Sequence, residues 1–375
     1  MNCVHIFGGQ QEQSLSFSVR TTPFLILLFF SLLSDCLNGQ SARIVRVDSL
    51  LTEMTNKDLF SGVVLIAENW RIELSKGYGY SNREKKIPNT PDTRFDLSSG
   101  SKIFTGTAIT LLAQQGKLHF SDTIGRYIKG LPGGNIITIH QCLTHSSGFD
   151  DFYRAKGFSY QKVKNCTDVL PFMKELPLKY KPGDSCIYST GNAIVLGALI
   201  EKITGMSFQE YIGTTFIEPF ELKNTSFTPY WKLDESQRQY AVGYKRKSTG
   251  GYQRNAYDYD FGFITLSAGG AWSSAKDLYN FDKAIFTGKI VNEEYLKIMT
   301  SRYTPQWKKC HFGYIWIIDD SHTSCVGHAG TSSGWNSWNY YYPGKKTVLI
   351  ILTNLGSVDI FALSALIDQM LFDEN

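Results

Sequence analysis

The chain has 375 residues, of which 42% are hydrophobic and 14% aromatic, so it can bury a large core and is not a disordered protein. Its 38 Lys and Arg residues against 34 Asp and Glu residues give a net charge of +4. This charge is spread along the sequence without a basic block, which argues against a nucleic-acid partner.

The N-terminus predicts export. Arg20 precedes an apolar run from Phe24 to Leu33, and small and polar residues follow that run. This order is typical of a signal peptide, and the run is shorter than the roughly 20 residues of a membrane-spanning helix. We therefore predict a leader over residues 1–40, with a retained anchor as the alternative, and a periplasmic or extracellular location.

If the exported chain is attached to a membrane, we expect lipidation to be the only route. Leu33-Ser34-Asp35-Cys36 loosely resembles a bacterial lipoprotein box, with Cys36 as the residue that would carry the lipid. Asp35 stands where such a box has a small residue, which weakens the match.

The remaining cysteines favour neither disulfides nor a metal site. Cleavage after Cys36 would leave Cys142, Cys166, Cys186, Cys310 and Cys325, an odd number that cannot all pair within the chain. No CxxC or Cys/His cluster is present, and the seven histidines are scattered. We predict no metal and no cofactor.

After the leader, apolar residues recur at helical spacing and predict an amphipathic helix over residues 42–57. Two β-rich runs, 61–70 and 71–80, meet at a short turn near Glu68 and Asn69 and predict an antiparallel hairpin. Gly and Pro then punctuate a helical middle, for which we predict helices over residues 102–115, 138–144, 167–175, 191–204 and 207–217. Strand character returns late, and the final elements that we predict are strands in 311–320, 337–344 and 345–354 and a helix over 358–372.

These elements predict an α/β protein of the α+β type, with one antiparallel sheet assembled from both chain ends, flanked by helices, and a mostly helical insertion. We place a single domain at residues 41–375. Its sheet lobe would comprise 41–100 and 262–375, and its helical lobe 101–261. A ligand cleft is expected between the two lobes.

Ser99 and Lys102 stand three residues apart where a strand passes into a helix, so their side chains share one helix face. A lysine whose pKa is depressed by burial could take the serine proton, and the helix N-terminus would favour an oxyanion. Ser as a helix cap with a solvated Lys is the structural alternative. A second S-x-x-K, Ser273 to Lys276, also precedes a helix, but that helix is amphipathic, whereas the one after Lys102 is apolar on nearly all sides.

Another serine motif is rejected. Residues 330–334 (GTSSG) fit the G-x-S-x-G elbow of α/β-hydrolases, but that fold has its histidine after the serine, and no histidine follows His328.

The text around Ser99, "FDLSSGSKIFTGTAITLLAQQGKLHFSDTIGRYI", resembles the active-site region of the serine β-lactamase and penicillin-binding protein superfamily, in particular its class C-like branch. The resemblance continues through "ITIHQCLTHSSGFDDF", "YSTGNAIVLGALIEKITGMSFQEYI", "AGGAWSSAKDL" and "GHAGTSSGWNSWNYYYPGKKTVLIILTN", and covers residues 42–372. Several matches in the right order are far more specific than one S-x-x-K.

This resemblance implies that Ser99 is the acylated nucleophile, Lys102 its proton-handling partner and Tyr188 the second general acid/base. His328-Ala329-Gly330 would take the place of Lys-Thr-Gly on a sheet strand, with His328 donating to a substrate carboxylate or carbonyl, or orienting Tyr188. The oxyanion hole would be the backbone N–H groups of Ser99 and Thr331. Whether Lys102 or Tyr188 is the base in acylation stays open, because the two groups would titrate as a coupled pair.

Two departures from the family pattern bear on the substrate. Thr190 occupies the place of the usual Asn in the second motif, and Asn192 is the candidate that could replace it. His328 in place of Lys removes a permanent cation. Both changes point away from recognition of a β-lactam, more than from hydrolysis itself.

The resemblance therefore implies an exported serine hydrolase that acts through an acyl-enzyme on an ester or amide, with weak or no β-lactamase activity. A non-catalytic binding or sensor module is the alternative. The substrate would be a small molecule or peptide, and the oligomeric state is left open. Aromatic residues in 149–165 and 226–262 suggest an apolar cleft wall, and ordinary core packing would explain them as well.

Overall fold

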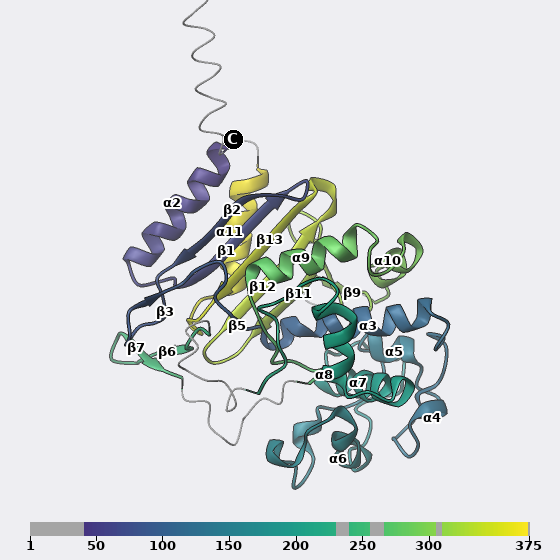
Figure 1. Ribbon diagram of the computed structural model, residues 1–375. Coiled ribbons are helices and arrows are strands. Elements are labelled where there is room, and N and C mark those ends of the chain that lie inside the picture. The colour runs from purple at the N-terminus through teal and green to yellow at the C-terminus, as the bar shows by residue number, and fades with distance from the viewer. Residues whose placement is uncertain (1–40, 230–239, 256–265, 305–309, 374–375) are drawn as a thin grey trace, which may run out of the picture. The chain divides into compact units, whose positions relative to one another are not determined.

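A seven-stranded antiparallel sheet is central to the computed structural model, which describes residues 41–229, 240–255, 266–304 and 310–373 (Figure 1). Its strand order is β2-β1-β13-β12-β11-β10-β9, so the first and last thirds of the chain form one sheet, as predicted. The bounds are β1 Gly62–Glu68, β2 Arg71–Tyr78, β9 Cys310–Phe312, β10 Ile317–Asp319, β11 Cys325–Thr331, β12 Asn336–Tyr342 and β13 Thr347–Thr353.

Helices cover both faces of this sheet, which explains why its central strands read as continuous apolar runs. On β1, Val63 and Leu65 belong to the larger core under the helical insertion, whereas Val64 and Ile66 pack into a second core beneath α2 and α11. The helices are α2 Ala42–Asn56, α3 Lys102–Gln114, α4 Ile124–Tyr127, α5 Ile139–Leu143, α6 Leu170–Lys174, α7 Thr190–Thr204, α8 Phe208–Ile212, α9 Ala275–Phe286, α10 Glu293–Met299 and α11 Ile360–Phe372.

Most element predictions are confirmed to within a residue or two, including the helix over 42–57, the early hairpin and the closing helix. One prediction is wrong: residues 311–320 do not form a single strand. They divide into β9 and β10, because the chain turns through residues 313–316, where Ile315 has a φ of +69°. A β-branched residue in that region marks a tight, tertiary-enforced turn that apolar content alone does not reveal.

The border that we predicted for the helical lobe differs from the structure. Residues 240–254 fall within the predicted helical lobe, but they contain a separate two-stranded hairpin of β6 (Tyr244–Arg246) and β7 (Tyr252–Arg254). Tyr244 forms a parallel bridge to Leu355, and Ala241 N donates to Arg94 O at 2.8 Å. The position of this hairpin depends on tertiary contacts, because a short hairpin has no core of its own and is stable only when it packs against other elements.

The chain from Ala42 onward forms one compact unit. The predicted leader, Cys36, and the aromatic residues Tyr257, Tyr259 and Phe261 lie outside the described residues. No helix in the described ranges combines the length and apolar character needed to cross a membrane. The five cysteines that follow the leader are free.

Candidate active site

A strained backbone turn presents Ser99. The short strand β5 (Phe95–Asp96) leads into the 3₁₀ turn η1 (Ser98–Ser101) and then directly into α3. Ser98 has a φ of +49°, and its N–H donates to Asp96 Oδ1 at 2.7 Å. Since a non-glycine residue rarely adopts this conformation, the turn is maintained by its surroundings. Ser99 is left partly exposed at the N-terminal end of the helix.

Lys102 is the partner of this serine. Its Nζ donates to Ser99 Oγ at 2.8 Å, and the side chain is fully buried. Burial lowers the pKa of Lys102 to about 7, and the negative charge of Asp151 partly opposes that shift. A substantial fraction of the amine is therefore neutral near pH 7, and the neutral amine can accept the Ser99 proton.

Tyr188 approaches the same pair from the loop before α7. Lys102 Nζ lies 5.2 Å from the centroid of its ring. Burial raises the pKa of Tyr188, and interaction with the Ser99 hydroxyl only partly offsets the effect. Tyr188 is consequently a protonated phenol near neutral pH, suited to donating a proton rather than to abstracting one first.

His328 lies on β11 beside Tyr188, with the two ring centroids 6.1 Å apart. Its Nδ1 is hydrogen-bonded to the carbonyl of Ala329, and a carbonyl can only accept, so Nδ1 carries the proton. Burial lowers the pKa of His328 to about 3, with a further contribution from Lys102. The ring is neutral and its Nε2 is an acceptor, an arrangement that favours orientation of Tyr188 by His328 over donation to a substrate carboxylate or carbonyl.

Close backbone contact explains the glycine at position 330. A Cβ there would lie 2.0 Å from Leu97 O and 2.7 Å from Gly100 N, so only glycine allows β11 to contact the turn that presents Ser99. Ser337 on β12 donates to the same Leu97 carbonyl at 2.8 Å. This contact brings the backbone of Thr331, the next residue of β11, alongside the serine turn. Gly330 thus shapes the site through its backbone.

Thr190 and Asn192 are both engaged away from the cavity. Thr190 N and Oγ1 donate to Asp151 Oδ1 at 2.8 and 2.7 Å. Asn192 is fully buried, accepts from Ser147 Oγ, and contacts His145 Nδ1 through its Nδ2 at 3.2 Å. Neither residue lines the cavity at Ser99.

His145 was not assigned a role from the sequence, although it lies within the resembling stretch "LTHSSGF". It is fully buried, its ring packs 4.6 Å from that of Tyr188, and its Nδ1 accepts from Ser189 N at 3.3 Å. Its carbonyl also accepts from Ile187 N at 3.0 Å. His145 therefore holds the backbone on both sides of Tyr188. Its backbone φ of +55° is imposed by the surrounding structure, and nothing in the sequence predicts it.

A cavity of about 560 Å³ opens at these groups. It contacts Ser99 and Tyr188 and then follows β11 past His328 and Thr331. Because β10 pairs with β11 only at residues 325–327, the edge of β11 from 328 to 331 has no neighbouring strand on that side in the described ranges. A free strand edge beside a nucleophile can bind an extended substrate backbone.

The second S-x-x-K motif and the aromatic residues of 149–165 have structural roles. Ser274 caps α9 by accepting from Asp277 N at 3.2 Å, and Lys276 is exposed. Aromatic residues of the 149–165 segment pack against one another, with Phe152 and Phe158 rings 5.1 Å apart, and none lines the cavity. Phe149 and Phe152 are buried in the core, whereas Tyr153 is exposed, so the segment is not a cleft wall.

The comparisons with known proteins agree with this geometry. The family model described as "Beta-lactamase" matches residues 47–366. The chain belongs to the beta-lactamase family. It is accordingly a serine hydrolase of the β-lactamase and penicillin-binding protein superfamily, with the fold predicted from its sequence.

Among relatives, "Putative penicillin-binding protein PbpX" of Bacillus subtilis (strain 168) is 28% identical over 296 residues, which are 79% of this chain and 71% of that protein. "Protein flp" of Staphylococcus aureus (strain MW2) is 25% identical over 323 residues, which are 83% of this chain and 63% of flp. The structure of a D-amino acid amidase from Ochrobactrum anthropi SV3 has a TM-score of 0.76 at 20% identity, with 88% of this chain and 98% of that chain covered. This last likeness shows the fold alone.

Proposed function

We propose that this family member hydrolyses an ester or amide through an acyl-enzyme on Ser99. One observation carries the proposal: Lys102 Nζ, fully buried and with its pKa lowered to about 7, lies 2.8 Å from Ser99 Oγ. A lysine with an ordinary pKa would be protonated and could not accept the serine proton.

In acylation, the neutral amine of Lys102 accepts the Ser99 proton while Oγ attacks the substrate carbonyl carbon. The backbone N–H groups of Ser99 and Thr331 donate to the oxyanion that forms. Tyr188 then protonates the leaving alcohol or amine, the scissile C–O or C–N bond breaks, and the proton on Lys102 passes to the phenolate. Water attacks the acyl-enzyme by the reverse proton route. We therefore propose Lys102 rather than Tyr188 as the first base, and its lowered pKa supports that choice.

His328 is proposed as a positioning group in this cycle. Its neutral ring presents Nε2 as an acceptor, suited to a hydrogen bond from the Tyr188 hydroxyl or from a substrate N–H or O–H. A neutral acceptor offers nothing to the carboxylate that β-lactams carry. We therefore propose esterase or D-amino peptidase chemistry with weak or no β-lactamase activity.

A fluorophosphonate probe and intact mass spectrometry test the nucleophile. The probe should add once per chain, with the adduct on Ser99 and none on Ser99→Ala. Ser273→Ala, in the second S-x-x-K, is the matched control and should label normally. An adduct at a residue other than Ser99 in the folded protein would contradict the assignment.

A non-catalytic binding module is the second candidate, and the engagement of Thr190 by Asp151 in place of a substrate-facing amide favours it. Turnover separates the two. Short-chain nitrophenyl esters should release product steadily over many cycles, and Ser99→Ala should abolish the release. One equivalent of product followed by no further release would identify a protein that acylates without turning over.

Export is part of the proposal and is supported by the Arg20 and apolar leader pattern. N-terminal sequencing of the protein recovered outside the cytoplasm should begin within about ten residues of position 40. A protein that keeps Met1 and stays in the cytoplasm would contradict export. Incorporation of labelled palmitate that is lost in Cys36→Ser would establish lipidation.

A further inference from the structure

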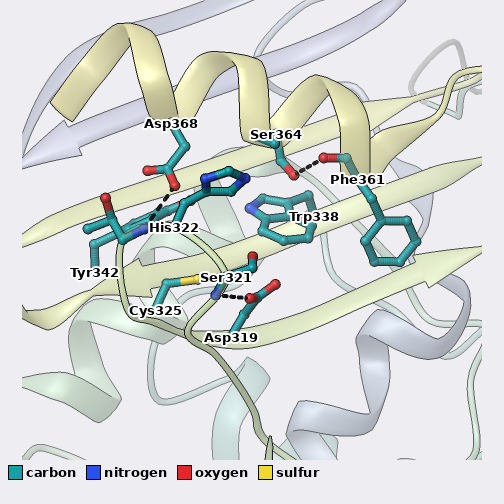
Figure 2. Close-up of a pocket in the computed structure, with 11 residues that line it drawn as sticks. Asp319, Ser321, His322, Cys325, Trp338, Tyr342, Phe361, Ser364 and Asp368 are labelled. Carbon is teal, nitrogen blue, oxygen red and sulfur yellow. Dashed lines mark hydrogen bonds between the residues drawn. The ribbon is translucent and has the colours of Figure 1, made fainter. Parts of the chain in front are cut away.

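A second cavity, of about 200 Å³, lies between helix α11 and the sheet (Figure 2). Asp368 and Ser364 reach it from the helix, Trp338 from β12, and His322 from the segment between β10 and β11. The proposed chemistry at Ser99 leaves this cavity without a role.

One buried polar atom of its wall has no hydrogen-bond partner within the described ranges. Asp368 is 5% exposed, and although its Oδ2 accepts weakly from Thr323 N at 3.4 Å, its Oδ1 has no partner. Trp338 is 4% exposed, and its indole N–H interacts with the Tyr342 hydroxyl beside the same cavity. Because an unmet buried polar atom costs about 1–3 kcal/mol, Asp368 Oδ1 at the cavity wall indicates a site built for a ligand.

This cavity adjoins the one at Ser99. Asp319, Ser321 and Phe361 line both of them, so a substrate held at Ser99 can extend across the free edge of β11 to the α11 face. Phe361 is 55% exposed at this junction, an unusual position for a large apolar side chain, and its ring meets that of Trp338 edge to face at 5.9 Å.

The charged residues that line the α11 cavity favour a cationic ligand. Asp319 and Asp368 both contribute carboxylates, and no Lys or Arg lines either cavity. His322 is exposed and makes no hydrogen bond to Asp368. Burial raises the pKa of Asp368 to about 6, the negative charges of Asp373 and Asp319 add to the shift, and His322 and the Thr323 N–H only partly oppose it. An anionic group would be repelled here, whereas a cation would pair with Asp368 and pack against aromatic faces.

We propose that the α11 cavity binds a primary ammonium group of the substrate through Asp368 Oδ1, with Trp338 as the aromatic wall. The proposal rests on the proposed function at Ser99 and specifies its substrate class: esters or amides that carry an amine several bonds from the scissile carbonyl.

Binding to the Ser99→Ala protein tests the subsite without turnover. Isothermal titration calorimetry would compare hexylamine with hexan-1-ol, which differ only in the charged end. We expect hexylamine to bind about tenfold more tightly, a ratio typical of one charge-assisted hydrogen bond. Adding Asp368→Asn, which keeps the side-chain shape, should bring the ratio close to one. Asp359→Asn is the control, because it removes an exposed charge at the start of the same helix, an asparagine keeps the cap, and the ratio should stay unchanged.

The results distinguish this inference from the function on which it rests. An amine preference that disappears with Asp368→Asn supports the subsite even if no ester is ever hydrolysed. Equal ratios in the Asp368 and Asp359 variants, or no preference in the parent, would overturn it. In the active enzyme, hexylamine should compete with an ester that carries a primary amine, because both would place an ammonium group at Asp368. Purely noncompetitive inhibition would show that the two cavities do not act on one substrate.

Discussion

Replacing Lys102 by arginine should abolish ester hydrolysis at every pH between about 5 and 9, because a guanidinium stays protonated throughout that range. The wild-type enzyme should behave differently. Its kcat/KM should fall on the acid side with an apparent pKa near 7, the value to which burial lowers the Lys102 amine. Below that pH the protonated amine cannot accept the Ser99 proton.

The magnitude follows from the structure. A shift in pKa from 10.5 to about 7 corresponds to roughly 5 kcal/mol of differential stabilisation of the neutral amine, at about 1.4 kcal/mol per unit. About half of the enzyme is then competent at pH 7. With an unshifted lysine the competent fraction would be roughly one in 3,000.

The assay is the initial rate of nitrophenyl ester hydrolysis at low substrate, corrected for the Ser99→Ala background at each pH. Asp151→Asn should move the acid limb to lower pH, because the Asp151 charge raises the Lys102 pKa. Lys276→Arg, at the exposed second S-x-x-K, is the matched control and should leave the profile unchanged. A rate that stays constant down to pH 5, or a Lys102→Arg enzyme within tenfold of wild type, would refute the assignment of Lys102 as the base.

Three further changes test the packing around the site. Burial raises the pKa of Asp282 to about 8, so the free energy of unfolding should fall as pH rises from about 4 to 8. In urea titrations, Asp282→Asn should raise the free energy of unfolding by about 1–3 kcal/mol at pH 8 and leave it unchanged at pH 4. An equal gain at both pH values would show that ionisation of Asp282 is not the cause. Gly330→Ala should lower kcat/KM at least about 100-fold by pushing β11 from the Leu97 carbonyl, whereas Gly344→Ala, with open space around it, should have no effect. His145→Ala should reduce kcat more than it changes KM, and a change in KM alone would contradict its role in holding the Tyr188 loop.

Local patterns carry most of what could be predicted of the fold. The runs around Val64 and Ile350 are apolar throughout because both faces of the sheet are covered. Their length and residue types predict strands directly. The hairpin near Asn69 follows from its short turn. The split of 311–320 at Ile315 and the bridge from Tyr244 to Leu355 could not be predicted, because both depend on neighbours that only the folded chain supplies.

The candidate site divides in the same way. Ser99 and Lys102 are one helical turn apart, so their contact is local and the motif already contains it. The tautomer of His328 could not be foreseen, because it depends on one backbone carbonyl in β11. The same holds for Thr190, whose hydroxyl binds Asp151 from a loop that is distant along the chain.

The sequence by itself determined the family, the strand and helix pattern, and the pairing of a hydroxyl with an amine, because these depend on periodicity and on short spacings along one chain. Tertiary structure alone decided the protonation of that amine, the acceptor role of His328 and the acidic cavity beneath α11. Each of these depends on burial and on charges brought together from remote segments, and neither burial nor the distance between such segments is encoded in any local pattern.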